Sequence, residues 1–182
     1  MKFKDKVVVI GLDGADFSLI RPWLEDGTLP NIRKVFKNGI SGPLKSCFPP
    51  ASSPAWKCFS KGQNPGKLDV YSFRKSSCDS YTPYIVNSRS FPDEEIWDFI
   101  GKHGYKSGVL FMISTYPPKA VNGFMVTGIL TPSERSDFSY PKKLKKSIKW
   151  QILRLSLRQT TLGAAENFLM HILRIFEIKQ KF

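Results

Sequence analysis

Asp13 and Ser52 are the two residues of this 182-residue sequence whose type and position best suit chemistry. Asp13 directly follows the apolar run 6–12, and a carboxylate there can bind a hard or borderline divalent cation. Ser52 lies in a proline-rich loop before a predicted helix, whose amide groups and dipole favour an anion such as phosphate. A serine hydroxyl becomes a useful nucleophile when a metal or a base removes its proton. We therefore examine Asp13 as a metal ligand and Ser52 as a nucleophile.

Both positions also have plain structural interpretations, which the local sequence leaves open. Asp13 fits an Asp-Gly turn, or a carboxylate that accepts hydrogen bonds from loop amides. Ser52 and Ser53 fit simple caps of the following helix, with Pro54 in its first turn. Two other phosphate-binding motifs are excluded, because the sequence has neither G-x-G-x-x-G after the first predicted strand nor a P-loop G-x-x-x-x-G-K-[ST].

The elements that position these residues follow a pattern of strands alternating with helices. Continuous apolar runs predict buried strands, and apolar residues at helical spacing predict the helices. This alternation is typical of an α/β domain with a doubly wound, mostly parallel sheet. Ligands of such sheets lie at the carboxyl ends of the strands, which points to Asp13, the Ser52 loop and the loop after Ile113. The predicted strands are 6–12, 42–47, 107–113 and 124–129, and the predicted helices lie within 17–27, 30–39, 53–62 and 93–103.

Composition and charge set further bounds. The length suits one domain, and no apolar stretch is long enough to span a bilayer. Three cysteines without C-x-x-C spacing argue against a disulfide framework or a structural zinc site, so we expect a reducing, cytoplasmic location. The net charge is +13, and residues 142–182 carry ten of the 28 Lys and Arg residues but only two of the 15 acidic ones.

The basic tail, residues 142–182, is predicted to be an amphipathic helix or a pair of helices. Its apolar residues recur at helical spacing and need a partner surface. We expect that partner to be the rest of the sheet, a separate C-terminal half, or a second copy of the chain bound through residues 148–178. Nucleic acid and an anionic membrane surface are weaker alternatives as partners. The simplest interpretation of the basic residues is a helix face exposed to solvent. The predicted domains are therefore 1–141, the α/β part, and 142–182, the tail.

Three blocks of sequence carry a resemblance to a known family. Taken in order and with their spacing, they cover most of residues 5–141. They resemble the type I phosphodiesterase/nucleotide pyrophosphatase branch of the alkaline phosphatase superfamily. The first block is 7–16 with 29–32, the second is 49–56 with 62–66, and the third is 116–118, 121–124, 130–133 and 140–141.

The resemblance implies an alkaline-phosphatase-like fold and a metal-dependent phosphohydrolase. Asp13 matches the first metal-binding aspartate of the family, and Ser52 matches the nucleophile, which also binds metal. The metal is usually zinc, with two ions in the complete site, and the nucleophile forms a covalent phospho-enzyme. The expected substrate is a small-molecule phosphate ester.

The resemblance also indicates what this sequence lacks. The family builds its two-metal site from several aspartates and three histidines, whereas this sequence has only His103 and His171, and neither matches a ligand position. The sequence therefore looks like the N-terminal, truncated part of the fold, with an incomplete site. A non-catalytic relic or subunit of such an enzyme is the first alternative. A phosphomutase or phosphonate hydrolase of the same superfamily is the second.

Overall fold

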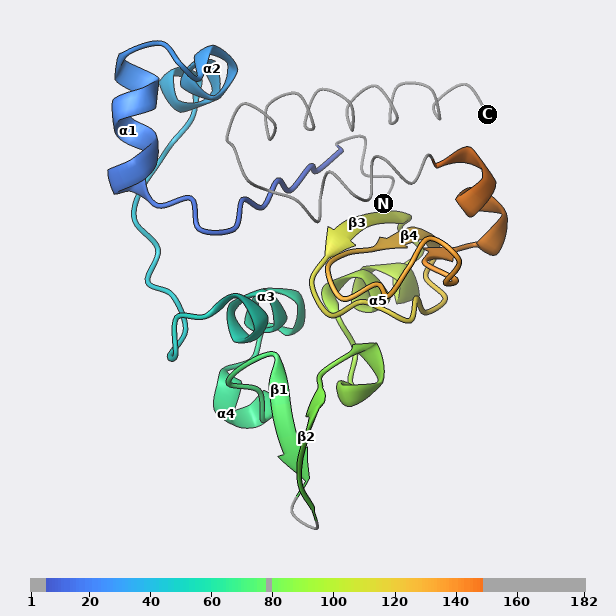
Figure 1. Ribbon diagram of the computed structural model, residues 1–182. Coiled ribbons are helices and arrows are strands. Elements are labelled where there is room, and N and C mark those ends of the chain that lie inside the picture. Colours follow the sequence, from blue (N-terminus) through green and yellow to red (C-terminus); the bar gives the residue numbers. More distant parts are fainter. Residues whose placement is uncertain (1–5, 78–79, 149–182) are drawn as a thin grey trace. The chain divides into compact units, whose positions relative to one another are not determined.

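The computed structural model of the chain describes residues 6–77 and 80–148. It separates into two units, Met1–Lys45 and Ser46–Phe182, and each is described by itself. Figure 1 shows the order of the helices and strands along the chain. Asp13 belongs to the first unit, whereas Ser52 belongs to the second.

The first unit contains two helices, α1 (Phe17–Glu25) and α2 (Pro30–Asn38), as the sequence predicts. Asp16 caps α1, since its carboxylate accepts a hydrogen bond from the Ser18 amide at 3.0 Å. Pro30 begins α2, where its fixed φ suits the first helical turn. The two helices share a small apolar cluster of Ile20, Leu24 and Leu29, with Ala15, Trp23, Ile32 and Phe36 packed around it.

The prediction of a buried first strand at 6–12 is wrong in this structure. Residues 6–12 are assigned to no strand, and Val7 to Ile10 are 50–85% exposed. A parallel strand is buried only when neighbouring strands and helices cover it, and the described part of this unit offers helices alone. The predicted strand at 42–47 is also not formed, and Leu44 is fully exposed.

The second unit begins with helix α3 (Ser52–Lys61) and the short helix α4 (Pro65–Leu68). A hairpin of β1 (Arg74–Ser77) and β2 (Ser80–Ile85) follows, then the 3₁₀ turn η1 (Ser88–Ser90) and helix α5 (Ile96–Lys102). The chain continues into β3 (Ser107–Met112), β4 (Gly123–Thr127), β5 (Ser139–Tyr140) and the 3₁₀ segment η2 (Lys142–Ser147). The strands form two separate sheets, β1-β2 and β3-β4-β5.

The three-stranded sheet is covered on both faces, which gives the unit its α/β layering. β3 pairs with β4 in parallel and β5 pairs with β4 antiparallel. Val109 and Met125 pack against Trp97 of α5. On the other side, Val126 packs with Phe138 and with Leu144 of η2. The carboxyl ends of β3 and β4 therefore lie at one edge, where the sequence predicts ligand binding.

At this edge of the sheet the backbone after β4 lies very close to the backbone of β3. Phe111 has a positive φ of 57°, and the pairing register shifts between Leu110 and Met112. Gly128 follows β4, and a Cβ atom placed there would lie 2.2 Å from the Phe111 carbonyl oxygen. Only glycine therefore fits at position 128 without moving the bulged strand.

The mixed α/β class is confirmed, whereas a single doubly wound sheet is not, since the strands of the described ranges form two small sheets. The predicted strands at 107–113 and 124–129 are present as β3 and β4. The hairpin, α4 and β5 were not predicted. No helix within 6–77 or 80–148 is long and apolar enough to cross a membrane. Of the predicted helical tail 142–182, the first residues form the 3₁₀ segment η2, whereas residues 149–182 lie outside the described residues.

Candidate active site

Ser52 is the first residue of helix α3 and is half-buried. Ala51 precedes it as the N-cap residue, with an extended backbone at φ −120° and ψ 152°. The first hydrogen bond of the helix joins the Ala55 amide to the Ala51 carbonyl at 3.0 Å. The sequence predicted a loop serine before a helix capped by Ser53, so the helix begins earlier than expected. Ser52 thus has a rigid support, which a loop does not provide.

The plain interpretation of the two serines as caps is wrong, because both lie inside α3. Ser53 is fully buried, and its Oγ has no hydrogen-bond partner among the described residues. The amide groups of a first helical turn have no acceptor within the helix, and the helix dipole places partial positive charge there. An anionic group beside Ser52 would be stabilised by both effects.

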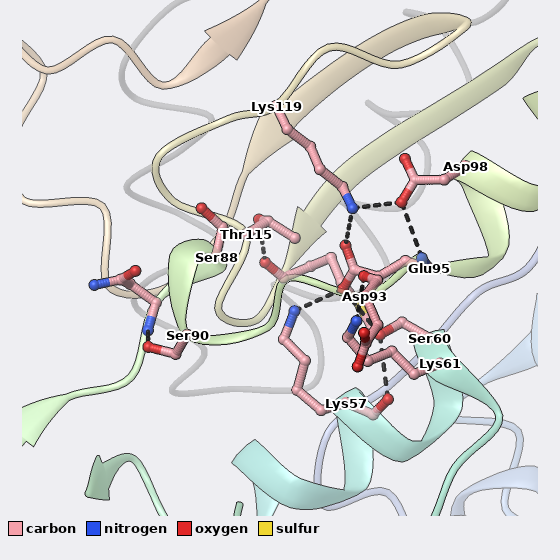
Figure 2. A network of polar contacts seen from close by, with 12 residues as sticks. Lys57, Ser60, Lys61, Ser88, Ser90, Asp93, Glu95, Asp98, Thr115 and Lys119 are labelled. Atoms are coloured by element: carbon pink, nitrogen blue, oxygen red, sulfur yellow. Dashed lines mark hydrogen bonds and ion pairs between the residues drawn. The ribbon is translucent and has the colours of Figure 1, made fainter. Parts of the chain in front are cut away.

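A buried ion pair holds the middle of α3. The ammonium Nζ of Lys57 lies 2.7 Å from Glu95 Oε1, and the two residues are 1% and 4% exposed. The same carboxylate oxygen accepts a hydrogen bond from the Ser60 hydroxyl at 3.2 Å. Figure 2 shows Lys57 and Ser60 of α3 directed toward Glu95, which precedes α5. The helix that carries Ser52 is therefore bound to the layer beside the three-stranded sheet.

A second lysine completes the network from the loop between β3 and β4. Lys119 Nζ lies 3.1 Å from Glu95 Oε2 and also pairs with the Asp98 carboxylate (Figure 2). Asp98 in turn accepts a hydrogen bond from the Glu95 amide at 2.9 Å, which fixes the start of α5. Both oxygens of the buried Glu95 carboxylate are thus satisfied by cations, as buried charge requires.

The electrostatics of the two lysines differ. Burial lowers the pKa of Lys57, although the Glu95 carboxylate acts in the opposite direction. Burial also lowers the pKa of Lys119, but hydrogen bonds and charge from Asp98 and Glu95 outweigh it and leave the pKa raised. The Lys57 ammonium also lies 4.8 Å from the centre of the Phe91 ring, a cation–π contact. The network therefore pairs the two lysine cations, Lys57 and Lys119, with the carboxylates of Glu95 and Asp98.

Small polar side chains line the edge where β3 and β4 end. Ser114 and Thr115 follow β3 and are buried, and Ser114 has a positive φ of 57°. The Thr115 hydroxyl donates to the Met112 carbonyl at 2.6 Å and accepts from the Gly128 amide at 3.3 Å. Thr127 of β4 shares a hydrogen bond of 2.8 Å with Thr131. The loop after Ile113 is thus a turn with hydrogen-bonded hydroxyl groups. It lies at the carboxyl ends of the strands, where the sequence predicts ligand binding.

Asp13 lies in a turn before α1, next to Gly14, whose φ is +69°, and it is exposed. The Asp-Gly turn expected from the sequence is therefore present. Asp13 and Ser52 belong to different units, and the prediction that they face one crevice stays a prediction. Two further assignments also stay predictions: Asp13 and Ser52 as metal ligands, and Ser52 as the nucleophile.

The remaining candidates for a metal centre are few. His103 ends α5, as expected, and its Nδ1 lies 2.9 Å from the Phe99 carbonyl oxygen. His171 lies outside the described residues. Within 6–77 and 80–148 no group of three or more His, Cys, Asp or Glu side chains could hold a metal ion. The oxygen donors of Asp13 and Ser52 suit a divalent cation in kind, but these two residues do not complete a centre.

The Lys57–Glu95–Lys119 network was not predicted from the sequence. Glu95 falls within the predicted helix 93–103, and nothing in the sequence assigned it a partner. Lys57 shares the buried face of α3 with Ser53, Pro54 and Ser60, so no apolar pattern in the sequence marks that face as buried. A lysine on a buried face requires a carboxylate partner.

Comparison with known proteins identifies a family. A family model described as type I phosphodiesterase / nucleotide pyrophosphatase matches residues 7–172, which is most of the chain. No curated protein and no solved structure matches the chain. The matched range includes Asp13, Ser52 and the whole polar network.

Proposed function

Because the chain belongs to the type I phosphodiesterase/nucleotide pyrophosphatase family, we propose that it hydrolyses a phosphate ester with Ser52 as its nucleophile. The family is one of phosphoesterase-type hydrolases. The observation that carries the assignment of Ser52 is its place as the first residue of α3, a ten-residue helix. The helix dipole and first-turn amides favour a phosphoryl group there, and the half-buried hydroxyl is carried on the same turn.

In the proposed reaction the Ser52 oxygen attacks phosphorus and the bond to the leaving alcohol breaks. The hydroxyl proton passes to water as the new oxygen–phosphorus bond forms, and the departing alkoxide takes up a proton from water to become the alcohol. Water later hydrolyses the phosphoserine and restores the Ser52 hydroxyl. Amides of the α3 first turn would hold phosphoryl oxygens, where negative charge accumulates. The buried Lys57–Glu95 pair holds α3 in place, which keeps the nucleophile oriented.

We propose that a divalent metal, zinc by resemblance to the family, assists this reaction. Asp13 and Ser52 would supply oxygen ligands, and a complete site of the family would take two ions. A bound metal lowers the pKa of a coordinated hydroxyl and stabilises charge on the transferred group. The described residues do not form a complete metal centre, so we expect the 182-residue chain to have an incomplete site and weak activity.

The proposed substrate is a small-molecule phosphate ester, a phosphodiester or a nucleotide pyrophosphate. A phosphomutase or phosphonate hydrolase would use the same front part of the fold and remains an alternative within the superfamily. A second candidate function is a non-catalytic subunit. The absence of a three-ligand metal group among the described residues favours it. In that case the chain would retain the fold and the α3 anion site without turnover.

The test is hydrolysis of a nitrophenyl phosphodiester by the full chain with zinc or manganese added. We expect slow release of nitrophenol, together with a phosphoryl group on Ser52 after acid quenching and peptide mass spectrometry. Ser52→Ala should abolish both signals, because no other group takes the place of the nucleophile. Ser133→Ala is the matched control, since Ser133 lies in an exposed loop and should change neither signal.

Two outcomes would redirect the proposal. Turnover that survives Ser52→Ala would exclude Ser52 as the nucleophile. Zinc binding without turnover or phosphoserine would favour the non-catalytic subunit.

A further inference from the structure

The dipeptide Asn-Gly occurs at two places in the chain, at Asn38 and at Asn122, and both asparagines are exposed to solvent. The amide nitrogen of the residue after an asparagine can attack the asparagine side chain. Glycine favours this attack, because it has no Cβ to obstruct the nitrogen and its backbone rotates readily. The same chemistry is therefore available at both places, and the surroundings of each asparagine decide whether it proceeds.

Asn38 is the last residue of α2, and Gly39 follows it with an extended backbone. In the described part of the chain, the Gly39 amide makes no backbone hydrogen bond to the preceding helical turn. The equivalent amides after α1 and α3 do so, since Asp26 and Gly62 donate to helix carbonyls at 2.9 Å and 2.8 Å. Residues 40–47 then form no helix or strand (Figure 1). The backbone around Gly39 is therefore held from one side only, by α2.

Asn122 is held at both its side chain and its main chain. Its Nδ2 donates to the Tyr105 carbonyl oxygen at 3.0 Å, and its own carbonyl accepts from the Ser107 amide at 2.8 Å. Gly123 begins β4, and a Cβ atom placed there would lie 2.1 Å from the Ser107 carbonyl oxygen. The Asn122 side chain and the Gly123 backbone therefore cannot rotate toward each other unless this end of the β3–β4 pair opens.

We propose that Asn38 is a site of spontaneous deamidation in the folded chain, whereas Asn122, in the same dipeptide, is protected by the pairing of β3 and β4. The reaction requires water and no enzyme. It converts Asn38 into a mixture of aspartate and isoaspartate.

The reaction has two steps. The Gly39 amide nitrogen attacks the side-chain carbonyl carbon of Asn38 and loses its proton. The bond from that carbon to the side-chain nitrogen breaks, and the nitrogen leaves as ammonia, which gives a five-membered succinimide. A water molecule then adds to one of the two ring carbonyls and opens the ring. Opening at one carbonyl gives aspartate, and opening at the other gives isoaspartate, with the main chain running through the former side chain.

The modification changes the end of α2 in charge and in length. Either product places a carboxylate at the C-terminal end of the helix, where the helix dipole already carries partial negative charge. Isoaspartate also adds a carbon atom to the main chain between α2 and the segment that follows. Both products should weaken the last turns of α2, which carry Phe36 of the apolar cluster shared with α1.

The experiment incubates the full chain at mildly alkaline pH and follows both asparagines by peptide mapping, with chromatographic separation of the aspartate and isoaspartate peptides. We expect both products at position 38. Conversion of Asn122 should be slower by roughly tenfold or more, because two hydrogen bonds must open first. The same incubation in concentrated urea should bring the two rates together. No substrate or metal is involved, so the outcome is independent of the proposed hydrolase activity.

Two variants test the attacking group. Gly39→Ala places a methyl group beside the attacking nitrogen and should slow conversion of Asn38. Gly42→Ala is the matched control in the same segment, since no atom lies within 4 Å of its added carbon, and it should leave the rate unchanged.

Three results would overturn the proposal. Equal rates at the two asparagines of the folded chain would show that β3–β4 pairing gives no protection. An Asn38 that stays intact when folded but converts in urea would show that the end of α2 is itself protected. A difference between the two sites that persists in urea would assign it to neighbouring residues and not to the fold.

Discussion

Lys57 of α3 and Glu95, the residue before α5, form an ion pair of 2.7 Å with both side chains almost fully buried. Lys119 binds the second carboxylate oxygen of Glu95, so the three residues join α3, α5 and the loop between β3 and β4. This network, and not the loop before it, sets the position of the helix that carries the proposed nucleophile.

Glu95→Gln should strongly destabilise the chain. The variant leaves the Lys57 ammonium buried without its counter-charge, which costs about 3–5 kcal/mol of unfolding free energy in comparable sites. Urea unfolding followed by circular dichroism measures it. Asp69→Asn is the matched control, because it removes the charge from the exposed Lys75–Asp69 pair and should cost less than about 1 kcal/mol. Equal costs for the two variants would mean that the buried pair does not hold the fold.

Gly128→Ala should destabilise the three-stranded sheet. The added Cβ would lie 2.2 Å from the Phe111 carbonyl oxygen, so the bulged end of β3 would have to move. Overpacking of this kind costs about 1–3 kcal/mol. Thermal unfolding compares it with Gly42→Ala, where no atom lies within 4 Å of the added carbon. If both variants unfold at the wild-type temperature, the close approach at Phe111 is not tight.

The pKa of Asp16 should be below its ordinary value of 3.8, because the Ser18 hydroxyl and amide both donate to its carboxylate. A lowered carboxyl pKa contributes stability that is present above pH 3.8 and is lost as the pH falls through the lower folded value. Ser18→Ala should move the pKa back toward 3.8. Side-chain carbon shifts in a pH titration by NMR report it. The pKa of Asp26, which is lowered by Thr28, serves as the internal control and should not change.

Zinc binding should depend on both Asp13 and Ser52. We expect Asp13→Asn and Ser52→Ala each to weaken zinc binding by roughly tenfold or more, since even residues that only orient ligands cost 10- to 100-fold. The double variant should bind little worse than either single one if, as we propose, the two residues bind the same ion. Isothermal titration calorimetry measures this, with Asp137→Asn as the control. Two zinc ions bound by the wild-type chain, with one of them lost in each single variant, would indicate two independent sites.

The basic tail, residues 142–182, should drive self-association. Its predicted apolar stripe would need a partner, and a separate C-terminal half or a second copy of the chain through residues 148–178 would supply one. Phe168→Glu, on the predicted apolar stripe, should reduce the sedimentation coefficient of the full chain at moderate salt. Gln159→Glu adds the same charge outside that stripe and should leave it unchanged. A monomeric wild-type chain would show that the stripe is already covered.

Local sequence signals predicted the helices better than the strands. Asp16, Pro30 and Gly62 mark helix ends through capping, ring geometry and a left-handed backbone, which act within a few residues. The run 6–12 has the composition of a buried strand, but a strand needs a partner strand. The segment 42–47 holds a glycine, a proline and a lysine, so its strand signal was weak. β3 and β4 have such partners, and the sequence placed both. The hairpin 74–85 was missed because its residues are mostly polar and show no alternation.

The sequence identified single candidate residues of the site but not the contacts between them. Ser52 was found because a proline-rich loop before a helix is a local pattern. The Lys57–Glu95 pair was not, because its members are 38 positions apart and nothing near either residue identifies the other. Long-range charge pairing is decided by packing, which the local pattern does not encode.

The ion pair between Lys57 and Glu95 also ties together the two ends of the chain segment between these residues. α4 and the hairpin of β1 and β2 lie in the chain between α3 and α5. The ion pair joins Lys57 of α3 to Glu95, the residue before α5, so the two ends of this segment are held together. Lengthening a loop that is already closed costs little entropy. Residues added within the hairpin of β1 and β2 should therefore leave the helix that begins at Ser52 in place.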